Sequence, residues 1–255
     1  MLQNFSAQLF LGLAQRRLFQ KGLPVFTYHS IGDAPPGARD PFLYVSKARF
    51  NEQLAMLVEH GFTSGSLENC ARREGNPDKK VVITFDDGYR NVLRNGLEAL
   101  TRHRFRAVQY IVAGLIGTRN EWDTKHGDVP EALMDTSEIR EWLAAGQEIG
   151  SHSLTHRNLS KLSEAEAREQ IMGSKKKLED TFGIAVRHFA YPGGKWTPMV
   201  RDLVQEAGYA TASTTKFGVN TVRTPQFELR RIFCLSEGEM LAKVKHRIAR
   251  RLGGR

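Results

Sequence analysis

The feature that most constrains the fold of this chain is a strand-like run followed by two adjacent carboxylates. The run is continuous, apolar and β-branched, it ends at Phe85, and Asp86 and Asp87 follow directly. Such a run is typical of a fully buried parallel strand. A second short run leads in the same way into His152, with His156 four residues later. Ligands of α/β sheets and barrels collect at the carboxyl ends of strands, so both groups are expected to face one mouth.

These two groups contain the residue types of a catalytic divalent metal site. One carboxylate and two imidazoles supply three ligands and leave a coordination position for water. Successive strand side chains point to opposite faces, so Asp86 and Asp87 are expected to diverge. Diverging carboxylates fit one ligand and one general base better than two acids that flank a glycosidic bond at least about 5 Å apart. Either group alone would also fit a turn or a pair of hydrogen-bonded side chains.

The rest of the chain alternates between strand-like and helix-like segments. Further strands are expected over residues 108–111 and 210–214. Helices are expected over residues 47–59, 91–103, 136–145, 164–182 and 198–207. The fourth of these helices begins with a capping box, from Ser163 to Glu166. The alternation favours a parallel α/β barrel, and a chain of 255 residues suits one domain with a large core.

Three strings in the chain resemble a known family. TFDDGY at residues 84–89, HSLTH at 152–156 and FAYPGG at 189–194, in that order, resemble the first three motifs of the polysaccharide deacetylases. These are carbohydrate esterase family four, of the chitooligosaccharide deacetylase type. The resemblance covers residues 23–235 and implies a distorted (β/α) barrel of about seven strands, with metal-dependent removal of an acyl group from an amino sugar.

The same resemblance implies roles for individual residues of the chain. By position in the motifs, Asp86 resembles the catalytic base and Tyr191 the backbone donor to the oxyanion. Asp87, His152 and His156 resemble the metal ligands. Zn²⁺ suits a set of two histidines and one aspartate, and Co²⁺ or Ni²⁺ can substitute for it. The implied substrate is an N-acylated amino sugar.

The chain departs from the familiar family pattern in three places. Ala190 stands where the third motif carries an arginine. No Asp-x-x-x-Trp fourth motif is evident. No Leu-x-x-His or Leu-x-His motif near the C-terminus supplies an acid, because His246 lies in a basic stretch and matches poorly.

Two other segments resemble replacements for the missing parts. Residues 25–30, Val-Phe-Thr-Tyr-His-Ser, resemble the first strand of the poly-N-acetylglucosamine deacetylase branch, in which the acid motif is moved to the N-terminus. By this resemblance His29 takes the acid role; a histidine that caps a strand is the alternative. Residues 229–232 resemble a late Leu-Pro-Arg-Ile segment, so Arg231 could stand beside Asp86 in place of the missing arginine, or form a surface ion pair.

The net charge of +9 is concentrated at the two ends of the chain. Residues 1–21 hold three basic residues and residues 241–255 hold six, with no acid in either segment, so together they account for the whole excess. Both ends carry apolar residues at helical spacing. We expect an N-terminal amphipathic helix over 1–22, the deacetylase-like barrel over 23–235 and a basic helix over 236–255. The helices would either dock on anionic lipid or pack on the barrel; no motif for nucleic acid is present.

Location and the remaining conspicuous residues are less constrained. Arg16 and Arg17 follow the first apolar stretch rather than precede it, which is unlike a secretory signal. A cytoplasmic location is therefore expected, with peripheral contact on the inner membrane as a variant. Cys70 and Cys234 are isolated thiols, expected as small apolar residues rather than a disulfide. The tryptophans of interest, for core packing or for stacking on a sugar, are Trp122 and Trp196.

Three functions fit these expectations. The first is metal-dependent hydrolysis of an N-acyl group, N-acetyl above all, from an amino sugar in a polysaccharide, an oligosaccharide or a precursor. The second is removal of acetyl or formyl from a lipid-linked amino sugar at the cytoplasmic membrane surface, which the basic ends favour. The third is an inactive sugar-binding homologue, which the missing arginine and fourth motif favour and the intact metal set disfavours.

Overall fold

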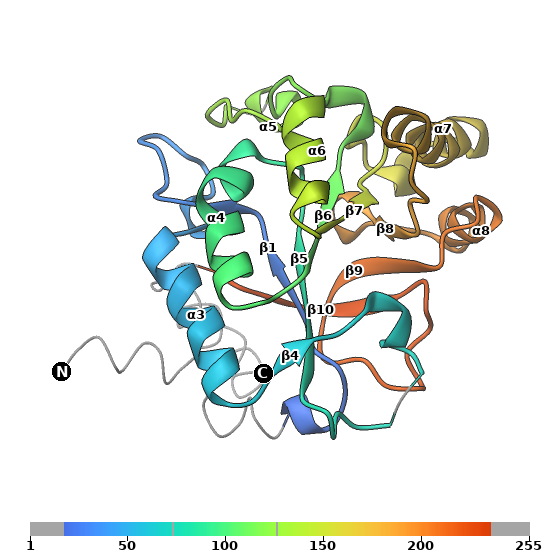
Figure 1. Cartoon of the computed structure of the whole chain (residues 1–255). Helices are drawn as coiled ribbons and strands as arrows, with labels where there is room; N and C mark the ends of the chain where they lie inside the picture. The colour runs from blue at the N-terminus through green and yellow to red at the C-terminus, as the bar shows by residue number, and fades with distance from the viewer. Residues whose placement is uncertain (1–17, 73, 126, 236–255) are drawn as a thin grey trace, which may run out of the picture.

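Seven parallel strands form a closed barrel at the centre of the molecule (Figure 1). The computed structural model describes residues 18–72, 74–125 and 127–235. Around the barrel the order is β1, β10, β9, β8, β7, β6 and β5, and β5 pairs back onto β1. The strands are β1 (Val25–Tyr28), β5 (Lys80–Phe85), β6 (Ala107–Ile111), β7 (Glu148–Ser151), β8 (His188–Ala190), β9 (Thr211–Phe217) and β10 (Leu229–Phe233). The expected α/β barrel of about seven strands is thereby confirmed.

The strands are short, mostly apolar and buried because protein covers both of their faces. Residues of one strand face, among them Val25, Val82 and Leu229, form a small cluster that fills the barrel. Residues of the other face, such as Phe26 and Phe85, belong to the large cluster between the strands and the helices. Three further strands lie outside the closed ring: β4 (Thr63–Ser64), which pairs with β5, and the pair β2 (Ser30–Ile31) and β3 (Tyr44–Val45).

Helices surround the barrel, as Figure 1 shows for α3, α4 and α6 on one side and α7 and α8 on another. Their bounds are α3 (Lys47–Glu59), α4 (Arg90–Arg102), α5 (Glu121–Thr124), α6 (Thr136–Ala144), α7 (Glu164–Phe182) and α8 (Pro198–Glu206). The short 3₁₀ turns are η1 (Pro41–Leu43), η2 (Leu67–Asn69), η3 (Ala113–Leu115), η4 (Leu159–Lys161) and η5 (Pro192–Gly194). The five expected helices are present, and α7 begins with the expected capping box of Ser163 and Glu166.

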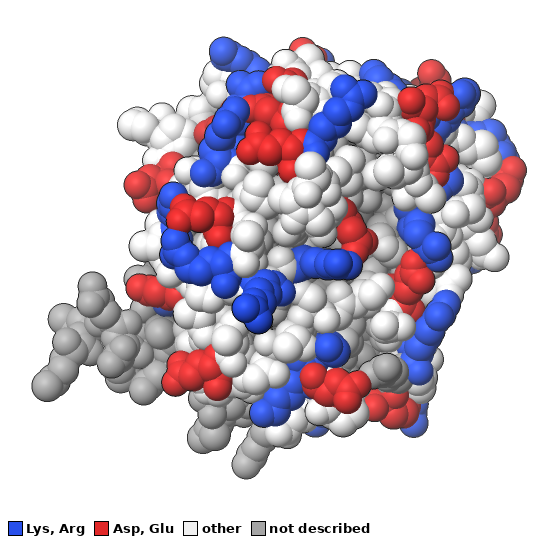
Figure 2. Space-filling model, viewed as in Figure 1, with Lys and Arg blue, Asp and Glu red and all other residues white. Residues whose placement is uncertain are grey.

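The segments expected as terminal helices, over 1–22 and 236–255, fall almost wholly outside the described residues. Within the described part of the chain, no helix is long and apolar enough to cross a membrane. Cys70 and Cys234 are buried free thiols, as expected. On the face shown in Figure 2, acidic and basic side chains are intermixed, in agreement with the balanced charge of the central part of the sequence.

Candidate active site

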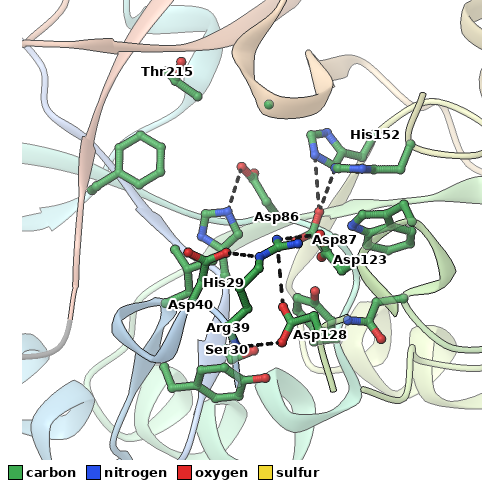
Figure 3. Close-up of a pocket in the computed structure, with 18 residues that line it drawn as sticks. His29, Ser30, Arg39, Asp40, Asp86, Asp87, Asp123, Asp128, His152 and Thr215 are labelled. Atoms are coloured by element: carbon green, nitrogen blue, oxygen red, sulfur yellow. Dashed lines mark hydrogen bonds and ion pairs between the residues drawn. The ribbon is translucent and has the colours of Figure 1, made fainter. Parts of the chain in front are cut away.

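Five of the seven residues predicted to carry the chemistry line one cavity at the carboxyl ends of the barrel strands, whereas Tyr191 and Arg231 do not line it. The cavity has a volume of about 200 Å³. The predicted site residues that line it are His29, Asp86, Asp87, His152 and His156. It is also lined by residues for which the sequence suggested no such place: Arg39, Asp40, Tyr44, Asn120, Asp123, Asp128, Gly193 and Thr215. In Figure 3, His29 faces Asp86, whereas His152 faces Asp87.

Asp87, His152 and His156 lie together as a set of potential metal ligands. One ligand atom from each lies within 4.8 Å of the others. Asp87 Oδ1 is 3.4 Å from His152 Nε2 and 3.3 Å from His156 Nε2. Within the described residues, this is the group of histidine, cysteine and acidic side chains that could hold a metal ion.

The protonation of the set suits a divalent cation. His152 Nδ1 donates to the carbonyl of Ala190 at 2.8 Å, which places the ring proton there and leaves Nε2 free as a ligand. Burial lowers the pKa of His152 to about 4, so its imidazole is neutral at pH 7. Burial raises the pKa of Asp87, but the nearby histidines outweigh burial and the net pKa lies below the usual range. A neutral imidazole and an ionised carboxylate are the forms that bind metals.

The divergence of the two aspartates is confirmed, but its cause is a turn rather than the alternation of a strand. Strand β5 ends at Phe85, and Asp87 has a left-handed φ of 73°. His156 likewise has a φ of 57° and lies in a turn, not on a helix. Non-glycine residues in this region are uncommon and carry backbone strain, which is concentrated at functional sites.

Asp86 is held by a buried arginine from the far end of the sequence. Arg231 Nη1 and Nη2 donate to Asp86 Oδ1 and Oδ2 at 2.7 and 2.8 Å, and Arg231 is fully buried. Its Nε also donates to the carbonyl of Thr214 at 2.9 Å. Burial raises the pKa of Asp86, but the charge and hydrogen bonds of Arg231 outweigh it and hold the pKa below its usual value. The expected position of Arg231 beside Asp86 is confirmed, and it is not a surface ion pair.

His29 also lies near this carboxylate. It follows β1 directly, and its Nε2 is 3.9 Å from Asp86 Oδ2. The ring stacks on Phe233 with centroids 6.0 Å apart, and its side chain remains 15% exposed. The position lets the imidazole reach both Asp86 and a molecule in the cavity.

Tyr191 does not fit the role of oxyanion donor. Its backbone N–H donates to the carbonyl of Ser213 at 3.1 Å, as part of the pairing between β8 and β9. The side chain is fully buried and its hydroxyl donates to the carbonyl of Phe227 at 3.1 Å. Gly193, two residues later, lines the cavity. The assignment of Tyr191 is therefore corrected: its backbone N–H pairs with β9 just beyond the end of β8, and the loop that follows lines the cavity at Gly193.

Other conspicuous side chains separate clearly by location. Trp122 lines the cavity, whereas Trp196 stacks on Tyr191 and carries Lys216 over its ring. His188 starts β8 and therefore lies at the opposite end of the barrel, where its Nδ1 is 2.9 Å from Thr211 Oγ1.

Sequence reasoning missed the polar residues that two loops bring to the cavity. The Arg39 guanidinium forms ion pairs with Asp40 at 2.9 Å and with Asp123 at 3.1 Å. The backbone N–H of Arg39 donates to Asp128 Oδ1 at 2.9 Å. Figure 3 shows Arg39 between these carboxylates. Asp123 and Asp128 lie 84 and 89 positions from Arg39 along the chain, so no local pattern marks these contacts.

Comparison with known proteins agrees with this site. The family model described as polysaccharide deacetylase matches residues 73–212, which is more than half of the chain. The chain belongs to the polysaccharide deacetylase family. As such a deacetylase it is a hydrolase that acts on carbohydrates at carbon–nitrogen bonds other than peptide bonds.

Relatives of this deacetylase include proteins of named activity. A chitooligosaccharide deacetylase of Bradyrhizobium sp. is 27% identical over 52% of this chain and 54% of its own length. A poly-β-1,6-N-acetyl-D-glucosamine N-deacetylase of Escherichia coli is 30% identical over 54% of this chain and 20% of its own length. A solved polysaccharide deacetylase from Bacillus cereus has a TM-score of 0.72 and 28% identity, over 88% of this chain and 69% of that one. This deacetylase thus matches about half or less of the two named enzymes' lengths.

Proposed function

We propose that this deacetylase removes the N-acetyl group from an amino sugar of a polysaccharide or oligosaccharide in a metal-dependent reaction. The supporting observation is that one cavity joins the Asp87, His152 and His156 set to a buried, ionised Asp86. Relatives named for deacetylation of chitooligosaccharides and of poly-N-acetylglucosamine support the choice of substrate. Zn²⁺ fits two imidazoles and a carboxylate, and Co²⁺ or Ni²⁺ would also suit them.

Asp87, His152 and His156 would hold a divalent ion, which would act as a Lewis acid toward the amide carbonyl and lower the pKa of water. Asp86 accepts the proton of the attacking water, because its carboxylate is ionised and lies next to the ligand Asp87. Arg231 keeps that carboxylate ionised and fixes both of its oxygens. Fixing the base in the reactive geometry is a large part of catalysis by positioning.

Two other groups complete the proposed reaction. His29 donates a proton to the departing amine, which is a poor leaving group while unprotonated; its place in the lining of the cavity, 3.9 Å from Asp86 Oδ2, supports this role. Gly193 is the candidate donor of a backbone N–H to the oxyanion, because it lines the cavity and Tyr191 does not. Neither the lipid-linked substrate nor an inactive binding role gains support from the described residues.

The test is direct incubation of the purified protein with N-acetylated β-linked glucosamine oligomers. Mass spectrometry should show loss of one acetyl group per turnover, abolished by a chelator and restored by Zn²⁺. Deacetylation that continues unchanged in metal-free protein would contradict metal dependence. Absence of any deacetylated product with all metals and all oligomer lengths would contradict the proposed reaction.

A further inference from the structure

The two imidazoles of the ligand set are held in different ways. His152 is almost fully buried, and its Nδ1 donates to the carbonyl of Ala190. The His156 side chain is 18% exposed, and among the described residues its ring has no hydrogen-bond partner besides Asp87. Metal-binding histidines almost always have their second nitrogen bonded to a carboxylate, a backbone carbonyl or water, which orients the ring. Among the described residues, His156 has no such carbonyl or carboxylate, so any protein support for the orientation of its ring comes from a different kind of contact.

The indole of Trp122 occupies the place where that support is needed. Its ring stacks on the His156 imidazole with centroids 4.4 Å apart and an interplanar angle of 29°. A stacked face leaves the ring edge free, so His156 Nε2 still points at Asp87, 3.3 Å away. The terminal torsion of histidine is intrinsically broad. An aromatic face against the imidazole restricts that torsion without using either nitrogen.

The segment that carries Trp122 is itself held in place by contacts of residues before and after the tryptophan. Asn120 is buried; its side-chain oxygen accepts from the N–H of Glu131 at 2.7 Å, and its amide nitrogen donates to the carbonyl of Val129 at 3.3 Å. Asp123, the residue after Trp122, forms an ion pair with Arg39 at 3.1 Å. These contacts hold α5 over the cavity, so the indole is a built support rather than a mobile side chain.

We propose that Trp122 is a positioning residue that holds the His156 imidazole in the orientation required for metal binding. The proposal rests on the metal site of the proposed function. In this account a planar ring at residue 122 replaces the hydrogen bond that His156 lacks. Trp122 acts through His156 and need not contact the sugar.

The test compares metal affinity in three variants with that of the wild type. Trp122→Leu removes the aromatic face, Trp122→Phe retains one, and Trp196→Leu is the matched control, because Trp196 is also half-buried and does not line the cavity. Zn²⁺ dissociation constants are measured in competition with a chelator and without substrate. Thermal unfolding of each metal-free variant establishes that it is folded. Loss of an outer support typically weakens metal binding 10- to 100-fold.

We expect Trp122→Leu to bind Zn²⁺ about 10-fold or more weakly, and Trp122→Phe and Trp196→Leu to stay within about 3-fold of the wild type. The Co²⁺-loaded Leu variant should also show an altered visible absorption band, whereas the control should not. If Trp122→Leu keeps wild-type affinity and only the KM for oligosaccharide rises, the indole is a sugar platform and the proposal is wrong. Equal weakening in folded Leu and Phe variants would also contradict it. A wild type that binds no metal would instead overturn the proposed function, and this inference with it.

Discussion

At the scale of single residues, Arg231 decides how Asp86 can act. Burial alone would raise the pKa of this carboxyl group, and the two-point contact with Arg231 reverses that direction. Asp86 is thus ionised over a wide pH range, although a lower pKa also makes it a weaker proton acceptor. Arg231 therefore makes the Asp86 carboxylate less basic but keeps it charged and fixed in position.

Replacing Arg231 should therefore change the pH profile. Arg231→Met removes the main influence that opposes burial and leaves only the charges of His152 and His29 to lower the pKa of Asp86. That pKa therefore rises, and the acid limb of kcat/KM moves to higher pH. Arg231→Lys keeps a positive charge and should shift the limb less. Leaving Asp86 buried without its partner should also cost about 3–5 kcal/mol of unfolding free energy. The measurements are pH–rate profiles and denaturant unfolding; an unshifted acid limb in a folded Met variant would argue against Asp86 as the base.

His29 makes a second prediction at this scale. If it protonates the departing amine, His29→Ala should lower kcat on an N-acetyl substrate by about 10²–10⁴-fold. An acyl ester with a good leaving group needs no such proton and should lose far less. Kinetics with both substrates measure the difference. A loss of only a few-fold on the amide would return His29 to a structural role.

At the scale of elements, regular structure and loops differ in how well the sequence predicts them. Helices α3 and α7 have the predicted bounds, because their apolar spacing and caps are local signals. Local runs also predicted several barrel strands, whereas the number of about seven strands came from the family resemblance. The backbone N–H of Tyr191, expected to face the oxyanion, instead pairs with Ser213 of β9. Such pairing depends on a strand distant in sequence, so the motif alone could not predict it, and the candidate donor is now Gly193.

The capping box of α7 provides a test confined to one element. Ser163 accepts from the N–H of Glu166, and the Glu166 side chain accepts in return from the N–H of Ser163. Ser163→Ala should lower the free energy of unfolding by about 1 kcal/mol and leave kcat and KM unchanged, because α7 packs outside the barrel. Chemical denaturation and steady-state kinetics check both parts. A change in kcat would show that α7 is coupled to the site.

At the scale of the whole molecule, the site is assembled from segments that no local pattern could join. Asp86 and Arg231 are 145 positions apart, and Arg39 meets Asp123 across 84 positions. Motif resemblance supplied the candidate ligands and the candidate base, since those lie in short strings of consecutive residues. It could not supply Arg39 or Trp122, whose roles depend on how two loops meet over the cavity.

The basic ends of the chain lead to a prediction about the whole protein. All nine excess charges lie in residues 1–21 and 241–255, and each lysine or arginine near an anionic surface contributes about 1 kcal/mol. We expect the full-length chain to co-sediment with anionic vesicles at low salt, to be released at high salt because salt screens these charges, and to ignore neutral vesicles. Equal binding to both vesicle types at low salt would contradict this expectation.

The measurement that tests the central claim most directly is zinc content beside activity in two single variants. His152→Ala removes a ligand and should lose both bound Zn²⁺ and deacetylation, while remaining folded because a catalytic metal on a large core is not the main source of stability. Asp86→Asn removes the base and not a ligand, so it should keep stoichiometric Zn²⁺ and lose about 10²–10⁴-fold in kcat. Full zinc content in His152→Ala, or near wild-type turnover in Asp86→Asn, would contradict the account.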